Sequence, residues 1–203
     1  MIKKMKKIIL TILFGLLFVT GQSQNIQVEW GKELKMVAET ELHDDNSMSF
    51  LYTELVIDNN KAASTYVQLF REQKFWEIPV YIHVEFRSFI AEQFLTNNVY
   101  MLGAAWNVLS KENGYITLEA MYRYDDCNNW QFTTVGGFFY KNLSFSHYAD
   151  FYGVDGLYMF SENKLFYQLS KHFKIGTNIE LGLNTREGKK WSCYPFAILR
   201  IDL

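Results

Sequence analysis

The sequence is poor in proline, cysteine and long apolar runs, and each shortage excludes a class of protein. With two prolines in 203 residues, it has no proline-rich linker to mark a domain boundary. The two cysteines, Cys127 and Cys193, lie in no CxxC or CxxH pattern, so no zinc motif is present. In an exported protein they can pair or stay separate, and the sequence leaves both open. Past the N-terminus no segment approaches 18 consecutive apolar residues, which excludes a helical membrane protein.

The N-terminus has the features of a secretory signal peptide. A basic stretch, MIKKMKK, precedes an apolar run of 12 residues, IILTILFGLLFV. Gly21 and Ser23 then supply small residues at the −3 and −1 positions of a cleavage after Ser23. The run is short for a spanning helix of about 20 residues, which disfavours the alternative of a membrane anchor. We therefore expect residues 1–23 to be a signal peptide and residues 24–203 to form a single domain.

The charge balance argues against a nucleic-acid partner. The whole chain has a formal net charge of −2, from 20 Lys and Arg against 22 Asp and Glu. Removing residues 1–23 takes away four lysines and no acid, which leaves 16 basic residues and a net charge of about −6. No basic patch remains to neutralise phosphates.

What the sequence has in abundance is alternation. In FKIGTNIELGLN, residues 173–184, the odd positions are apolar or Thr and the even positions are polar or Gly. VYIHVEFRSF and ITLEAMYRY alternate in the same way, and a period of two is typical of strands with two unlike faces. Turn signals between these segments predict a meander of twelve antiparallel strands. GKELK is a weak separator of the first two strands, so ten or eleven strands stay open.

Alternation fits two opposite structures. In a soluble up-and-down barrel the apolar face points inward, whereas in a transmembrane barrel it faces lipid. Two features favour the membrane barrel. Connections of alternating length are expected, with the longer ones at 58–61, 90–98, 125–129, 152–156 and 184–190. Aromatic residues also lie beside turns, where interfacial girdles belong: Trp30, Trp76, Tyr124, Trp130, Tyr140, Tyr152 and Trp191. The predicted fold is all-β, an antiparallel up-and-down transmembrane β-barrel.

Several stretches also resemble a known family. They run in order across nearly the whole mature chain: QNIQVEW at 24–30, KFW followed by Pro79, VYIHVEF at 80–86, GYITLEAMYRY at 114–124, NLSFSHYADF at 142–151, MFSENKLFYQLSKHF at 159–173 and CYP at 193–195. The chain resembles Gram-negative outer-membrane proteins grouped as a domain of unknown function and related to Tsx-type nucleoside channels. That resemblance implies a monomeric outer-membrane barrel with a narrow polar lumen. The C-terminal Phe usual in such barrels is replaced by Leu203.

If the polar face is inward, its side chains form the candidate solute path. We expect them to pair largely with one another, because unpaired charges beside a low-dielectric wall are costly. More acids than bases predict a path for small neutral or cationic solutes, with Tyr81, Tyr148 and Phe166 available to stack on a ring. The candidate residues are Glu54, Tyr81, His83, Glu85, Arg87, Glu119, Arg123, Tyr148, Asp150, Glu162, Lys164, Lys174, Glu180, Arg200 and Asp202.

Two alternatives to a channel stay open. One is a structural or loop-displaying barrel without transport. The other is a lipid-modifying enzyme, for which His147 is the candidate, since it falls on the apolar face near Ser144 and Ser146. No GxSxG or HExxH motif supports catalysis, so we expect no enzymatic activity. We also expect no catalytic residue, no cofactor and no metal, and as partners only outer-membrane lipid and a small polar solute.

Overall fold

We describe a computed structural model of the chain, in which residues 23–43, 47–57, 64–74, 80–91, 94–125, 129–153, 156–185 and 190–203 are described. These residues form twelve strands. The strands are β1 (Ser23–Trp30), β2 (Leu34–His43), β3 (Ser47–Ile57), β4 (Ser64–Lys74), β5 (Val80–Ala91), β6 (Phe94–Lys111), β7 (Gly114–Tyr124), β8 (Trp130–Tyr140), β9 (Leu143–Gly153), β10 (Leu157–Gln168), β11 (Phe173–Asn184) and β12 (Lys190–Asp202). Within those ranges, no helix is long and apolar enough to cross a membrane.

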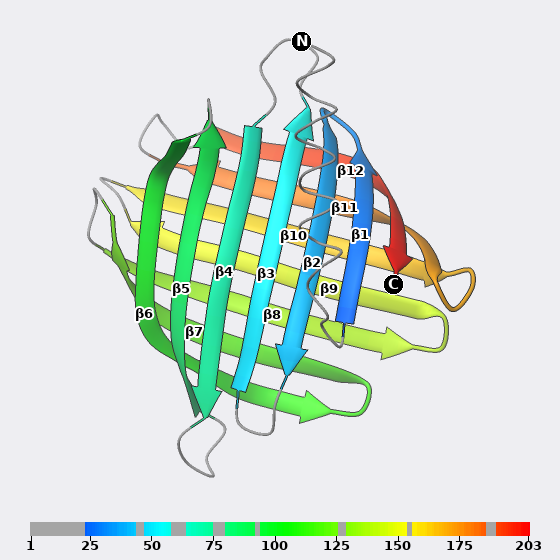
Figure 1. Cartoon of the computed structure of the whole chain (residues 1–203), viewed down its shortest axis with the longest axis horizontal. Helices are drawn as coiled ribbons and strands as arrows, with labels where there is room; N and C mark the ends of the chain where they lie inside the picture. The colour runs from blue at the N-terminus through cyan, green and yellow to red at the C-terminus, as the bar shows by residue number, and fades with distance from the viewer. Residues whose placement is uncertain are drawn as a thin grey trace.

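The strands close into one antiparallel barrel in which each strand pairs with its neighbours in sequence. Figure 1 shows β1 to β6 side by side on one wall, crossing β7 to β12 on the opposite wall. The barrel closes between β1 and β12, where Gln27 pairs with Arg200 and Glu29 with Ile198. Closure leaves no unpaired strand edge, as a sheet in hydrocarbon requires. The predicted twelve-stranded up-and-down barrel is confirmed.

The weak separator near the N-terminus does divide two strands, because residues 31–33 connect β1 to β2. The longer connection predicted at 90–98 is wrong. The β5–β6 ladder continues through Ile90 and Leu95, so residues 92–93 alone separate the strands. Thr96 pairs with Phe89 inside this ladder, and a register shift between Arg87 and Phe89 absorbs the irregularity. Continued backbone pairing therefore overrides the weak turn preference of TNN.

The apolar face of the alternating strands is the outer one. On β11, Ile175 and Ile179 are each 44 % exposed, whereas Asn178 is 0 % and Glu180 is 6 % exposed. The same division holds on β5, where Ile82 and Val84 are exposed and His83 is buried. The alternative of a soluble barrel with an apolar interior is therefore wrong. The outer surface is the lipid-facing band of a transmembrane barrel.

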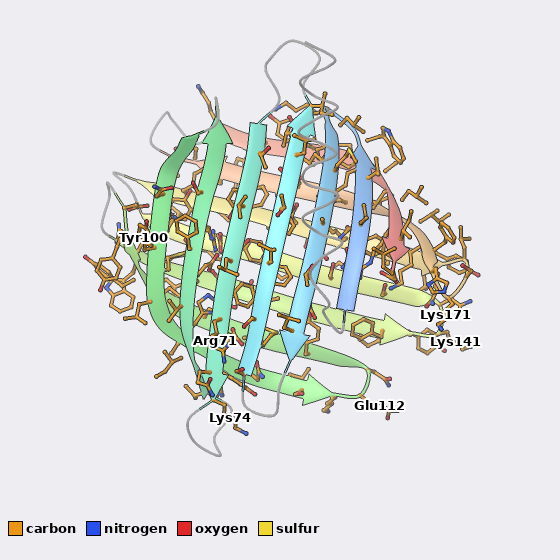
Figure 2. All side chains as sticks on the ribbon, viewed as in Figure 1. Arg71, Lys74, Tyr100, Glu112, Lys141 and Lys171 are labelled. Carbon is orange, nitrogen blue, oxygen red and sulfur yellow. The ribbon has the colours of Figure 1, made fainter. Side chains whose placement is uncertain are left out.

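The aromatic residues near strand ends lie largely on this outer surface. Trp30, Tyr124, Trp130, Tyr140 and Trp191 are all about half exposed or more. The prediction is wrong for Tyr152, which lies on the inner face, and Trp76 lies outside the described residues. Figure 2 shows Tyr100 pointing outward, and it shows Glu112, Lys141 and Lys171 where hairpins turn. Aromatic residues and charges thus lie at the two ends of the apolar band.

Two further expectations fall on residues outside those described. The predicted signal peptide covers residues 1–23, of which Ser23 alone is described. Cys127 also lies outside the described residues. Cys193 is a free thiol on the outer face of β12, paired in register with Leu181.

Candidate functional site: the lumen

The structure places all fifteen candidate residues on the inner face of the barrel. Residues paired in register on neighbouring strands point to the same side of the sheet. His83 on β5 pairs with Gly103 on β6, which pairs with Met121 on β7. On the far wall, Tyr148 pairs with Glu162, and Glu162 pairs with Glu180. Because side chains alternate strictly along a strand, one correct phase per strand is enough to assign the whole face. The inner-face residues form two charge networks.

The first network crosses the lumen through Arg87. Its Nη1 lies 2.6 Å from Oδ2 of Asp150, and its Nη2 donates to the hydroxyl of Tyr148 at 2.9 Å. Its Nε donates to Glu85 on its own strand. Between β5 and β9 stand the three strands β6, β7 and β8, so this contact spans the barrel interior. A fork of five N–H donors suits Arg87 to binding several acceptors at once.

Asp150 is the acceptor at the centre of this network. Its Oδ1 accepts hydrogen bonds from Thr133 Oγ1 at 2.6 Å and from Gln131 Nε2 at 2.8 Å. Its Oδ2 accepts from the hydroxyl of Tyr148 at 2.6 Å, in addition to Arg87. Asp150 is 3 % exposed, and these donors compensate for the loss of water around the carboxylate.

Arg123 extends the network toward the end of the barrel where β7 meets β8. Its Nη2 lies 2.5 Å from Asp125, and its Nη1 donates to Gln131 at 3.0 Å. The guanidinium also lies 4.1 Å from the ring centroid of Tyr152, a cation–π contact. This contact accounts for the inward position of Tyr152, which had been predicted to lie at the membrane interface.

The second network joins β1, β2, β3, β10 and β11. Lys35 Nζ lies 2.5 Å from Glu180 and 3.8 Å from Glu54. Lys164 Nζ lies 3.3 Å from Glu29 and 3.8 Å from Glu162. Lys35 also lies 3.7 Å from Glu33. Lys35 and Lys164 are 5 % and 7 % exposed, so each buried ammonium is compensated by at least two carboxylates.

A more exposed group lies near the barrel closure. Asp202 accepts from Arg200 Nε at 2.6 Å and lies 2.7 Å from Lys174 Nζ. Arg200 also lies 3.9 Å from Glu39. These side chains are roughly a quarter exposed, so water screens their attraction and the pairs contribute little to stability.

The inner face carries an excess of acid. Eleven carboxylates of described residues lie on it: Glu29, Glu39, Glu41, Glu54, Glu72, Glu85, Glu119, Asp150, Glu162, Glu180 and Asp202. Eight basic side chains share this face by the same register: Lys35, Lys74, Arg87, Arg123, Lys164, Lys174, Lys190 and Arg200. Both sets are counted over the described residues. Such an interior attracts cations and repels anions.

Sequence reasoning missed several inner-face residues, among them Lys35, Glu72 and Gln131. Glu72 lies in phase with Tyr66, Gln68 and Phe70 on β4, but Arg71 and Gln73 beside it are also polar. Alternation is lost at that end of the strand, where the outer surface leaves the apolar band. The available signal was the alternation of Tyr66 and Gln68 with the apolar Val67 and Leu69. Continued along β4, this alternation places Glu72 on the inner face.

His147 lies on the outer face, as its phase predicts. Its Nε2 is hydrogen-bonded to Thr134 Oγ1 at 3.0 Å, and its Nδ1 to Asn163 Oδ1 at 2.8 Å. Ser144 and Ser146 belong to the inner face, because they pair in register with the buried Phe166 and Lys164. The nearby serines that motivated the enzyme alternative are therefore on the opposite side of the sheet from His147.

Solved structures of similar fold include porins. The chain superposes on a KdgM porin in complex with disordered oligogalacturonate with a TM-score of 0.57 and 13 % identity, covering 87 % of this chain and 97 % of that chain. It superposes on a NanC porin structure with a TM-score of 0.61 and 6 % identity, covering 88 % and 98 %. At such low identity these likenesses concern the fold alone.

The comparison of sequences gives a family. No curated protein sequence matches the chain. The family model described as "Domain of unknown function (DUF5020)" matches residues 18–201, which is nearly the whole chain. The matched range includes every strand that carries the two charge networks. This twelve-stranded barrel therefore belongs to the DUF5020 family.

Proposed function

We propose that the protein is a narrow, monomeric channel in the outer membrane of a Gram-negative bacterium, open to small neutral or cationic polar solutes. The observation that supports the proposal is that the inner face is lined by charged side chains, some of which pair across the barrel, as Arg87 does with Asp150. A barrel without a solute path can fill its interior with apolar side chains, which avoids the cost of burying charge. The porin-like fold agrees with a channel.

The charge of the lumen defines the solute class. Eleven carboxylates against eight basic groups among the described residues make an acidic lining. The oligogalacturonate bound to the KdgM porin is a polyanion, and an acidic lining disfavours such a molecule. Nucleosides are neutral and carry a ring, so they fit the proposed class. Of the aromatic side chains proposed to stack on a ring, Tyr81 is half-buried, whereas Phe166 is only 3 % exposed.

Arg87 is the proposed constriction. It bridges the lumen by binding Asp150 and Tyr148 on the far wall. Replacing Arg87 with Ala removes the bridge and one positive charge, so we expect a higher single-channel conductance and a stronger preference for cations. Planar-bilayer recordings in a salt gradient measure both quantities. Removing one partner of a buried pair also destabilises a protein by about 3–5 kcal/mol, so folding is checked first by heat-modifiable migration.

Arg71→Ala is the matched control, because Arg71 is exposed and bonds only to Ser47 and Ser49 among described residues. It should leave conductance and ion preference unchanged. Wild-type protein that folds but conducts no ions contradicts the proposal. Selectivity for anions contradicts the assigned solute class.

A barrel without transport is the second candidate, and one observation favours it. Glu29, Gln131 and Asn178 are each 0 % exposed, and Met101 and Met121 on the inner face are at most 2 % exposed. Inner-face side chains so far removed from water are expected of a filled lumen. The same recordings separate the two candidates, because a permanently filled barrel conducts neither as wild type nor with Arg87→Ala.

A further inference from the structure

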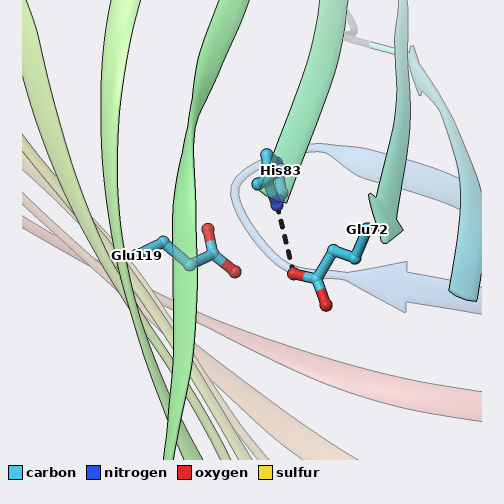
Figure 3. A group of neighbouring side chains, drawn as sticks. All are labelled: Glu72, His83 and Glu119. Carbon is cyan, nitrogen blue, oxygen red and sulfur yellow. Dashed lines mark hydrogen bonds and ion pairs between the residues drawn. The ribbon is translucent and has the colours of Figure 1, made fainter. Parts of the chain in front are cut away.

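The inner face contains a group of side chains that the charge networks do not explain. Glu72 on β4, His83 on β5 and Glu119 on β7 each offer a ligand atom, and these atoms lie within 4.8 Å of one another. The three residues are 6 %, 1 % and 8 % exposed. Figure 3 shows the carboxylate of Glu119 directed toward Glu72 and His83 from a different strand. The geometry points to a binding site for one divalent transition-metal ion, such as Zn²⁺.

The position of Glu119 is the first argument. The residue is more than nine-tenths buried, yet among the described residues its carboxylate makes no hydrogen bond and no ion pair. A carboxylate that is nearly buried and has no hydrogen-bonding partner is costly, and native interiors rarely keep one. The neighbouring strand offers Thr133 in register, but Thr133 donates to Asp150 instead. A cation bound at this point would supply the missing partner.

The surroundings of His83 are the second argument. Nδ1 of His83 lies 3.1 Å from Glu72 Oε1, and Nε2 lies 3.1 Å from Glu85 Oε2. A metal can take the place of the proton shared with Glu72, while Nε2–H continues to donate to Glu85. A carboxylate behind a ligating histidine fixes its tautomer and orientation in metal sites. The ring of Phe70 stacks on His83 with centroids 5.0 Å apart, which further fixes the ring plane.

Charge supports the same conclusion. Glu72, Glu85 and Glu119 surround a single imidazole, and Arg87 is the one fixed cation among the described residues that contacts them, through Glu85. A divalent ion would neutralise this excess in a region removed from water.

The ligand types select the class of metal. One imidazole and two carboxylates suit Zn²⁺ and its first-row neighbours, whereas Ca²⁺ and Mg²⁺ prefer oxygen ligands throughout. Ligand atoms around a tetrahedral Zn²⁺ lie about 3.3 Å apart, given Zn–N and Zn–O distances near 2.0–2.2 Å. In this structure the three ligand atoms lie within 4.8 Å of one another. Rotation of the Glu72 and Glu119 side chains would shorten these distances to those of a bound metal, and a solute or water would complete the coordination.

The test measures metal binding by the whole barrel in detergent, after treatment with a chelator. Titration calorimetry with Zn²⁺ should give about one ion per chain. Glu119→Gln should weaken binding at least about tenfold, since even loss of an indirect partner of a metal site has effects of that size. This variant loses no bond seen among the described residues, so it should fold. His83→Gln should abolish binding, and bound Co²⁺ should give a visible absorption band that both variants reduce.

Glu112→Gln is the control, because Glu112 is an exposed carboxylate in the hairpin before β7 and should not affect binding. The proposal is overturned if wild type binds no more Zn²⁺ than His83→Gln, or if Glu119→Gln binds as tightly as wild type. The site does not depend on transport. Conductance recorded with chelator present tests the channel alone, so either proposal can fail while the other stands.

Discussion

At the scale of single residues, His83 and His147 show how the face decides the role of a polar side chain. His83 points inward and lies among carboxylates from three strands. His147 points toward lipid, where water is absent, and obtains its hydrogen bonds from Thr134 and Asn163 on the adjacent strands. The outward histidine is therefore tolerated because its neighbours satisfy it.

This arrangement predicts an asymmetry between single and combined substitutions. Asn163→Ala leaves Nδ1 of His147 without a partner in hydrocarbon, and we expect a loss of about 1–3 kcal/mol in the free energy of unfolding. Ser161 belongs to the cluster, because its hydroxyl accepts from Asn163 Nδ2 at 3.2 Å. Replacing Thr134, His147, Ser161 and Asn163 together with Val, Leu, Ala and Leu removes these polar side chains and should be nearly neutral. Urea unfolding in lipid vesicles, followed by tryptophan fluorescence, measures both. A neutral effect of Asn163→Ala contradicts this account.

At the scale of elements, alternation allowed the inner residues of most strands to be predicted. In ITLEAMYRY the phase is unambiguous, and Glu119 and Arg123 were assigned to the inner face on it. It failed where strands leave the apolar band, as at Glu72, or where the ladder runs through a turn-like sequence, as at Thr96. At Glu72 the neighbouring polar residues reflect water at the barrel end rather than a change of face.

Close approach of strands is a second property of the elements. A Cβ on Gly176 would lie 2.8 Å from Cδ1 of Phe166 and would also meet the carbonyl oxygen of Leu165. Phe166 is 3 % exposed and fills the lumen over this glycine, which provides the space for its ring. Gly176 is thus a packing requirement of the β10–β11 pair.

We therefore expect Gly176→Ala to destabilise the barrel by about 1–3 kcal/mol, the usual range for overpacking. Gly136→Ala serves as the control, because its Cβ would meet a backbone oxygen at 3.3 Å and otherwise ordinary contacts. Its effect should be clearly smaller. Unfolding midpoints in urea compare the two variants, and equal effects would show that the close contacts of Leu165 and Phe166 do not restrict this position.

At the scale of the whole molecule, closure between β1 and β12 decides what the chain can be. Because every strand is paired on both sides, the barrel can place an apolar band in hydrocarbon without unpaired backbone groups. The same closure encloses both charge networks, whose partners come from strands as distant as β5 and β9. Neither network exists in a partly formed sheet.

The closed barrel therefore leads to a prediction about the cell fraction that contains the protein and about its migration on gels. We expect the mature chain to begin at Gln24 and to sediment with the outer-membrane fraction. Unboiled samples should migrate differently from boiled samples on SDS gels, because a closed barrel resists the detergent until heated. N-terminal sequencing of the membrane fraction checks the cleavage position, and recovery of the mature chain in the soluble periplasm would contradict the membrane assignment.

Alternation and turn signals predicted twelve strands, with ten or eleven still open at the N-terminus, and also their antiparallel order and the phase of most of them. These properties are local, because a period of two and a turn signal can each be recognised from a short run of consecutive residues. Which face is turned inward, and which charges meet, was decided by the tertiary structure. Alternation is the same for either orientation, and the pairing of Arg87 with Asp150 or of Lys35 with Glu180 depends on the curvature of the closed barrel. The approach of Glu119 on β7 to His83 on β5 has the same origin, since no spacing along the chain relates these residues until the paired strands β5, β6 and β7 curve into the closed barrel.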